Sequence, residues 1–133
     1  MTVICKLENN LNISDSINFC KKVLSSGRKI QSVEIVNKKG RSVECITKSN
    51  VFSLPIHKKE IFLMSEILQE SMRKEHNDYF GNVNYSYTSR EKVAIFSFRL
   101  GENMLIVISL MPSNPDTTAK KIISLICNTT VSA

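Results

Sequence analysis

The sequence predicts a single α+β domain with the element order αββαβββα, in which a five-stranded antiparallel sheet carries helices on both faces. Three observations lead to this prediction. The length of 133 residues suits one domain. Apolar residues recur at helical spacing in three segments and form strand-like runs in five others. The links between consecutive strands are short, which makes those strands antiparallel neighbours.

A helix and a hairpin are expected at the N-terminal side of the domain. The helix spans 14–26, because apolar residues repeat there every three or four positions and Gly27 can end it. Two strands follow at 29–37 and 41–48. The turn "KKG" joins them, and Gly40 can supply the positive φ of a tight turn.

A long helix, three strands and a final helix make up the rest of the chain. The long helix is expected over 57–79, with Gly81 just beyond its end. Asn114 can cap the final helix, and Pro115 suits its first position. The remaining expected elements are strands at 82–88, 92–100 and 103–111 and the final helix within 113–128.

The long helix carries an apolar stripe that is wider than one sheet surface needs. At about 100° per residue, six residues span roughly 140° of its circumference, and Leu63 extends the span to about 180°. A helix that rests on a sheet needs little more than about 100°. Either the connector at 49–56 covers the excess, with Phe52 and Leu54 as a lid, or a second copy of the helix does so across a two-fold axis. The six residues are Ile61, Met64, Ile67, Leu68, Met72 and Tyr79.

Positive charge is concentrated in the N-terminal half. Residues 1–59 hold eleven Lys and Arg against four acids, whereas residues 60–133 hold seven bases against eight acids. If the end of the first helix and the tip of the hairpin lie close together, they form a cationic patch for phosphates or an acidic protein. No aromatic residue interleaves these bases, so a solvated basic edge is the simpler interpretation. The candidate patch for an anionic partner consists of Lys21, Lys22, Lys38, Lys39 and Arg41.

The motifs of common enzymes are missing from the sequence. It has no G-x-x-x-x-G-K-[ST] loop, no G-x-G-x-x-G, no H-E-x-x-H and no G-x-S-x-G elbow. His57 and His76 lie more than five helical turns apart and cannot share a site within one chain. We therefore expect no catalytic residue, no cofactor and no metal, and a protein that is not an enzyme.

The four cysteines form no C-x-x-C pair, and no histidine lies near one at a zinc spacing. Cys20 and Cys127 fall on helical apolar stripes, and we interpret them as small buried hydrophobes. Without an export signal we expect no structural disulfide. The sequence leaves a redox role open for Cys5 and Cys45.

The expected location is the cytoplasm. No apolar run reaches the length of about 18 residues that a membrane helix needs, and the N-terminus does not have the pattern of a signal peptide. We therefore expect no membrane insertion. The single domain is expected to span 1–133, with flexible ends at 1–12 and 129–133.

The order of the elements over nearly the whole chain resembles the roadblock domain, the dynein-light-chain-type relative of longin and profilin-like folds. A closer likeness is to an uncharacterised archaeal roadblock-like family, and it rests on "RKE" at 73–75, "SREKVAIFSF" at 89–98 and "LGEN" at 100–103. This resemblance implies a protein without catalytic activity. It also implies dimers that pair their long central helices and their third strands, and partners among small Ras-like GTPases.

The resemblance makes a second copy the expected cover of the wide stripe. In the resembled fold the strand at 82–88 is a sheet edge, and an uncovered edge tends to pair. We therefore predict a homodimer held by residues 57–88. The interface residues that we predict are Phe62, Leu63, Ile67, Tyr85 and Tyr87.

The leading functional prediction is a homodimeric interaction module that scaffolds or regulates a small Ras-like GTPase. One alternative is a module that binds nucleic acid or another anionic surface through the basic hairpin at 37–41, with nucleic acid the less favoured partner. A second alternative is a small-molecule sensor. The continuously apolar strands within 92–111 indicate a filled core there and weigh against a roomy ligand pocket.

Overall fold

The computed structural model describes residues 13–48 and 54–131 of the chain. Three helices and five strands form there in the predicted order, with one additional short helix, α3, after the long one. The elements are α1 (Ile13–Ser25), β1 (Ile30–Val36), β2 (Ser42–Thr47), α2 (Ile56–Lys74), α3 (Asn77–Phe80), β3 (Ser86–Ser89), β4 (Ala94–Leu100), β5 (Asn103–Ser109) and α4 (Pro115–Val131).

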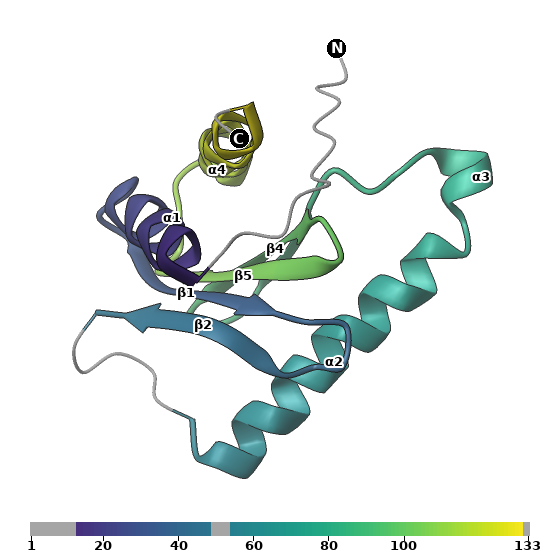
Figure 1. Ribbon diagram of the computed structural model, residues 1–133, viewed down its shortest axis with the longest axis horizontal. Coiled ribbons are helices and arrows are strands. Elements are labelled where there is room, and N and C mark those ends of the chain that lie inside the picture. The colour runs from purple at the N-terminus through teal and green to yellow at the C-terminus, as the bar shows by residue number, and fades with distance from the viewer. Residues whose placement is uncertain (1–12, 49–53, 132–133) are drawn as a thin grey trace.

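The five strands form one antiparallel sheet in the order β2-β1-β5-β4-β3. The strands β1, β5 and β4 lie in its middle, and β2 and β3 are its edges. Helices α1 and α4 cover one face, and α2 crosses the other (Figure 1). The predicted α+β class, with helices on both faces of a five-stranded antiparallel sheet, is confirmed.

Two apolar cores of unequal size hold the helices on the sheet. The larger lies beneath α1 and α4 and contains fifteen buried residues, among them Phe19, Phe96 and Ile122. The smaller lies beneath α2 and contains four buried residues, namely Val36, Leu63, Ile95 and Ile106. Burial of apolar surface is the main stabilising term in folding, so α2 is the less firmly held layer.

The β1–β2 turn confirms the prediction made for Gly40, whose φ is +79°. The side-chain oxygen of Asn37 accepts hydrogen bonds from the backbone N–H groups of Lys39 and Arg41, at 2.9 and 3.1 Å. Asn37 thus fixes the turn, and Gly40 provides the left-handed residue within it.

The final helix begins as predicted. The side chain of Asn114 accepts a hydrogen bond from the N–H of Thr117 at 3.2 Å, and Pro115 is the first helical residue. The helix then continues to Val131, past the predicted end at 128.

Two predicted elements were wrong in their extent. The long helix is not continuous over 57–79: at Glu75 and His76 the backbone N–H groups bond to carbonyls three residues back, and α2 ends. The strand predicted at 82–88 pairs only over Ser86–Ser89. Asn82 and Asn84 precede it, and asparagine is disfavoured in strands. The predicted flexible segment 1–12 lies outside the described residues.

Candidate interaction surface

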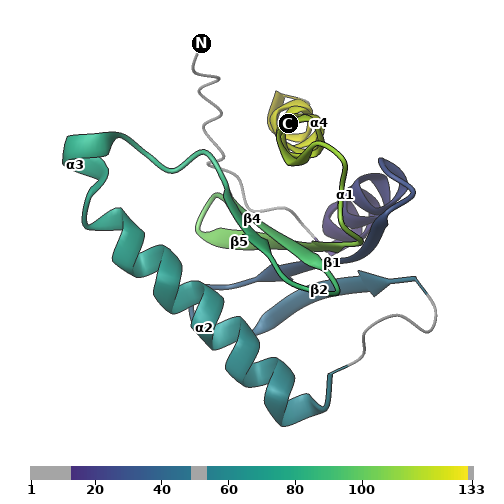
Figure 2. The same ribbon diagram turned by 180° about the vertical axis from the view of Figure 1, so that it is seen from behind.

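Four large apolar side chains form a row along the side of α2 that faces away from the sheet. Ile61, Met64, Leu68 and Met72 are 63%, 53%, 63% and 62% exposed. Their spacing of three or four residues aligns them on one face of a helix. Figure 2 shows this helix alone on its side of the sheet. We call these four residues the outer row.

The opposite side of α2 rests on the sheet. Leu63 is 3% exposed and belongs to the smaller core, and Phe62 and Ile67 are half-buried against that core. Glu66 is also buried on this side. Burial raises the pKa of its carboxyl, although the charge of Arg73 opposes this effect. The helix therefore places its more continuous apolar row outside and a less apolar face inside.

An ion pair between α2 and the sheet helps to fix this orientation. The Nζ atom of Lys59 lies 3.1 Å from Oε2 of Glu34, whose side chain is 8% exposed. Burial by itself lowers the pKa of Lys59, but hydrogen bonding and charge from Glu34 outweigh this effect, and the pKa is raised. Lys59 and Leu63 are four residues apart and share the inner face.

The five predicted interface residues do not form one surface on this chain. Phe62, Leu63 and Ile67 pack against their own sheet, as described above. Tyr85 and Tyr87 are half-buried against the larger core, on the face of the sheet that α1 and α4 cover. The ring of Tyr87 lies 4.9 Å from that of Phe96, and the ring of Tyr85 lies 6.0 Å from that of Phe98. Whether any of the five contacts a partner stays a prediction.

The connector gives the outer row no cover among the residues that the structure describes. Phe52, one half of the expected lid, lies outside these residues. Leu54 and Ile56 are themselves 48% and 78% exposed. Beyond the far end of α2, Tyr79 and Phe80 of α3 are 87% and 85% exposed, so exposed apolar surface extends past the helix.

The strand β3 is a sheet edge next in sequence to α2 and α3. It pairs with β4 over Ser86–Ser89, and its other side pairs with no strand in the described parts of the chain. Unpaired N–H and C=O groups on such an edge can accept another strand. Among the described residues, the outer row is touched only at Met64, by the β1–β2 turn at Gly40, and this edge is unpaired.

The basic residues predicted as one patch are divided between the two ends of β1. Lys21 and Lys22 are exposed on α1, which precedes β1, whereas Lys38, Lys39 and Arg41 belong to the turn that follows it. The seven residues of β1 lie between the two groups in the sequence. That the five residues form one patch stays a prediction. Binding of an anionic partner by either group stays a prediction.

The cysteines differ in environment. Cys20 is fully buried, and burial raises the pKa of its thiol to about 12. Cys45 is a half-buried free thiol whose sulfur atom lies 3.7 Å from Nζ of Lys59. Cys127 is half-buried and disulfide-bonded, so its interpretation as a small buried hydrophobe and the expectation of no structural disulfide were both wrong.

The described part of the chain contains neither a cluster of metal ligands nor a membrane-spanning helix. Within residues 13–48 and 54–131, no three side chains of His, Cys, Asp or Glu lie together in a way that could hold a metal ion. None of the helices in the described ranges is both long enough and apolar enough to cross a membrane.

Comparison with solved structures shows the fold. No protein-family model and no curated protein matches the sequence. MglB from Myxococcus xanthus has a TM-score of 0.71 and 10% identity, over 91% of this chain and 96% of that chain. The gliding protein MglB from Thermus thermophilus has a TM-score of 0.67 and 10% identity, over 98% of this chain and 100% of that chain.

A third similar structure names the fold directly. The Roadblock/LC7 domain from Streptomyces avermitilis has a TM-score of 0.64 and 11% identity, over 81% of this chain and 88% of that chain. The chain therefore has the fold of a roadblock domain, as the order of its elements predicted. The likeness to an archaeal family stays a prediction.

Proposed function

We propose that the protein is a non-catalytic homodimeric interaction module that scaffolds or regulates a small Ras-like GTPase. The observation that carries the dimer is the outer row, which leaves four large apolar side chains more than half exposed along one helix. Contiguous apolar surface of this kind is typical of protein–protein interfaces.

A second copy is the occupant that fits both uncovered features. Two α2 helices that pack antiparallel across a two-fold axis would cover both outer rows, with Ile61 opposite Met72 and Met64 opposite Leu68 of the second copy. In this register Lys58 of one helix faces Glu75 of the other, which is a favourable pairing of charges. A stable interface of this kind buries roughly 1,200–2,000 Å² in total.

The similar structures support self-association without demonstrating it for this chain. One of them is MglB with a tetrameric arrangement, at a TM-score of 0.66. The role with a GTPase rests on the resemblance to roadblock domains, many of which scaffold or regulate such proteins.

Light scattering coupled to gel filtration tests the dimer. At micromolar concentration we expect about twice the chain mass of 15.1 kDa. Leu68→Glu should give a folded monomer, because this side chain is 63% exposed and its charge would stay in water unless a partner covers it. Gln69→Glu is the matched control: it adds the same charge one residue away, about 100° around the helix, and should remain a dimer.

Two results would overturn the dimer. One is a mass near 15 kDa for the unmodified protein. The other is a full dimer of Leu68→Glu with an unchanged dissociation constant.

The GTPase role has a separate test, in which purified small GTPases of the host are loaded with GDP or a GTP analogue. Binding that depends on the nucleotide state supports the role, and equal or absent binding for all of them refutes it.

A further inference from the structure

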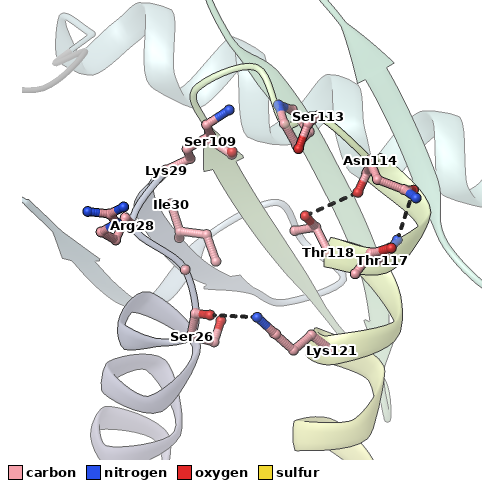
Figure 3. Close-up of a pocket in the computed structure, with 12 residues that line it drawn as sticks. Ser26, Arg28, Lys29, Ile30, Ser109, Ser113, Asn114, Thr117, Thr118 and Lys121 are labelled. Carbon is pink, nitrogen blue, oxygen red and sulfur yellow. Dashed lines mark hydrogen bonds between the residues drawn. The ribbon is translucent and has the colours of Figure 1, made fainter.

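A small cleft lined by three basic residues lies on the face of the sheet opposite α2. It has a volume of about 200 Å³ and forms where the end of α1, the start of β1 and the first turn of α4 meet (Figure 3). Among the described residues that line it, Arg28, Lys29 and Lys121 are charged and none is acidic. The side chain of Arg28 points away from Lys121 and from the first turn of α4 (Figure 3). Lys121 is 92 residues from Lys29 in sequence, so the fold alone brings these charges together.

The positive charges in the cleft are positioned but not neutralised. The Nζ atom of Lys29 donates a hydrogen bond to the carbonyl oxygen of Met111 at 3.0 Å. The Nζ atom of Lys121 reaches across to the carbonyl oxygen of Ser26 at 3.4 Å (Figure 3). These acceptors carry no net charge, and each ammonium group has two further donors. The three ion pairs found between described residues use other lysines.

A fourth basic residue, Lys48, lies beside the cleft. The Nζ atom of Lys48 donates a hydrogen bond to the carbonyl oxygen of Arg28 at 3.1 Å, so its charge lies close to the same backbone segment. Concave surfaces lined by charges of one sign concentrate ions of the opposite sign. This arrangement favours an anion in the cleft.

The first turn of α4 contributes neutral polar groups to the cleft. Asn114 already accepts a hydrogen bond from the N–H of Thr117, and Pro115 has no N–H to donate. The hydroxyl groups of Ser113 and Thr117 line the cleft beside the cations. The cationic side chains, and not the end of the helix, therefore provide the attraction.

We propose that this cleft binds the phosphate-monoester group of a small molecule, with Lys29 and Lys121 as its cationic contacts and Arg28 as a nearby positive charge. Two ammonium groups suit a dianion with three terminal oxygens, because they supply both charge and several N–H donors. Pockets for drug-sized ligands measure roughly 300–1,000 Å³. The cleft is smaller than this, and none of the described residues that line it is an aromatic residue on which a base could stack, so it favours a small phosphate ester over a nucleotide.

Titration with glycerol 3-phosphate, followed by NMR of the backbone amides, tests the proposal. Inorganic phosphate serves as the second probe and glycerol as the uncharged control. We expect saturable shifts for amides of 26–30 and 113–118 with both phosphate probes and none with glycerol. The affinity should fall as NaCl is added, since these side chains are exposed to screening. Shifts that do not saturate below about 20 mM probe would overturn the proposal.

Three variants separate this cleft from general attraction to a basic surface. Lys121→Ser and Lys29→Ser should each weaken binding about tenfold, since each removes a charge-assisted contact. Lys120→Ser is the control, because it removes the same charge from the residue of α4 that directly precedes Lys121. The Nζ atom of Lys120 pairs instead with Asp116 at 3.1 Å, so binding should change less than about twofold. Equal weakening by Lys120→Ser and Lys121→Ser would show that net charge alone attracts the phosphate and would overturn the proposed site.

Discussion

Gly40, in the turn between β1 and β2, lies directly against Met64 of α2. A Cβ atom at position 40 would lie 3.3 Å from the Cα atom of Met64 and would overlap its sulfur atom. The φ of Gly40, +79°, is also unfavourable for any residue with a side chain. The hairpin tip therefore packs on α2 only because residue 40 is glycine.

Replacement of this glycine should weaken the domain. We expect Gly40→Ala to lower the free energy of unfolding by about 1–3 kcal/mol, from backbone strain and displacement of Met64. Urea unfolding measures the change. Gly27→Ala is the control, because a Cβ there would meet Ile30 at an ordinary 3.4 Å, and it should change stability by less than about 0.5 kcal/mol. An equal effect at both positions would contradict this role for Gly40.

The ion pair between Lys59 and Glu34 should contribute to stability in a way that depends on both partners. Lys59→Met leaves the buried carboxylate of Glu34 unpaired and should cost about 1–3 kcal/mol, between the values for exposed and for buried pairs. The double variant Glu34→Gln, Lys59→Met should regain part of that loss. A double-mutant cycle of thermal unfolding checks the coupling, and strictly additive effects would show that the two groups do not interact.

Glu66 predicts a pH dependence of stability. Burial raises the pKa of its carboxyl, so the folded state binds this proton more tightly than the unfolded state does. The contribution of Glu66 to stability therefore falls as pH rises from the ordinary pKa through the raised one, and stays low above it. Glu66→Gln should raise the Tm at pH 7 by roughly 1–3 °C and flatten this dependence. Glu60→Gln, an exposed substitution on the same helix, should leave the curve unchanged.

We expect no binding of ATP or GTP with a micromolar Kd, and no hydrolysis of either. The physical reason is that the sequence has no phosphate-binding loop to surround a triphosphate with backbone N–H groups. Isothermal titration calorimetry checks the binding, and release of inorganic phosphate checks the hydrolysis. A micromolar Kd for either nucleotide would contradict this expectation.

Local features were readily predicted from the sequence. The cap at Asn114, the first-position proline and the left-handed Gly40 each depend on a few adjacent residues. Element order also followed, as did the pairing within the hairpin and within the last three strands, because short turns leave few alternatives. The β1–β5 pair that joins these two parts of the sheet was not predicted. The end of α2 was placed too late, because the helical apolar pattern continues through Tyr79 although the backbone hydrogen bonds change at Glu75.

The orientation of α2 required information that local pattern does not contain. Apolar residues lie both on the side of Leu63 and Ile67 and on the side of the outer row. The periodicity of apolar residues therefore could not decide which side faces the sheet. The contact that helps to decide it joins Lys59 to Glu34, 25 residues earlier in the sequence. The cleft was missed for the same reason, since Lys121 meets Arg28 and Lys29 only after α4 has folded back beside α1.

The unequal size of the two cores has a consequence for local opening. A helix seated on four buried residues can detach at a smaller free-energy cost than helices seated on fifteen. Amide protons of α2 should therefore exchange with solvent earlier than those of β1 and β5. In a dimer, release of α2 would also require separation of the two chains. Protection of this helix from exchange would then increase with protein concentration, so that assembly completes the folding of a layer that one chain holds only weakly.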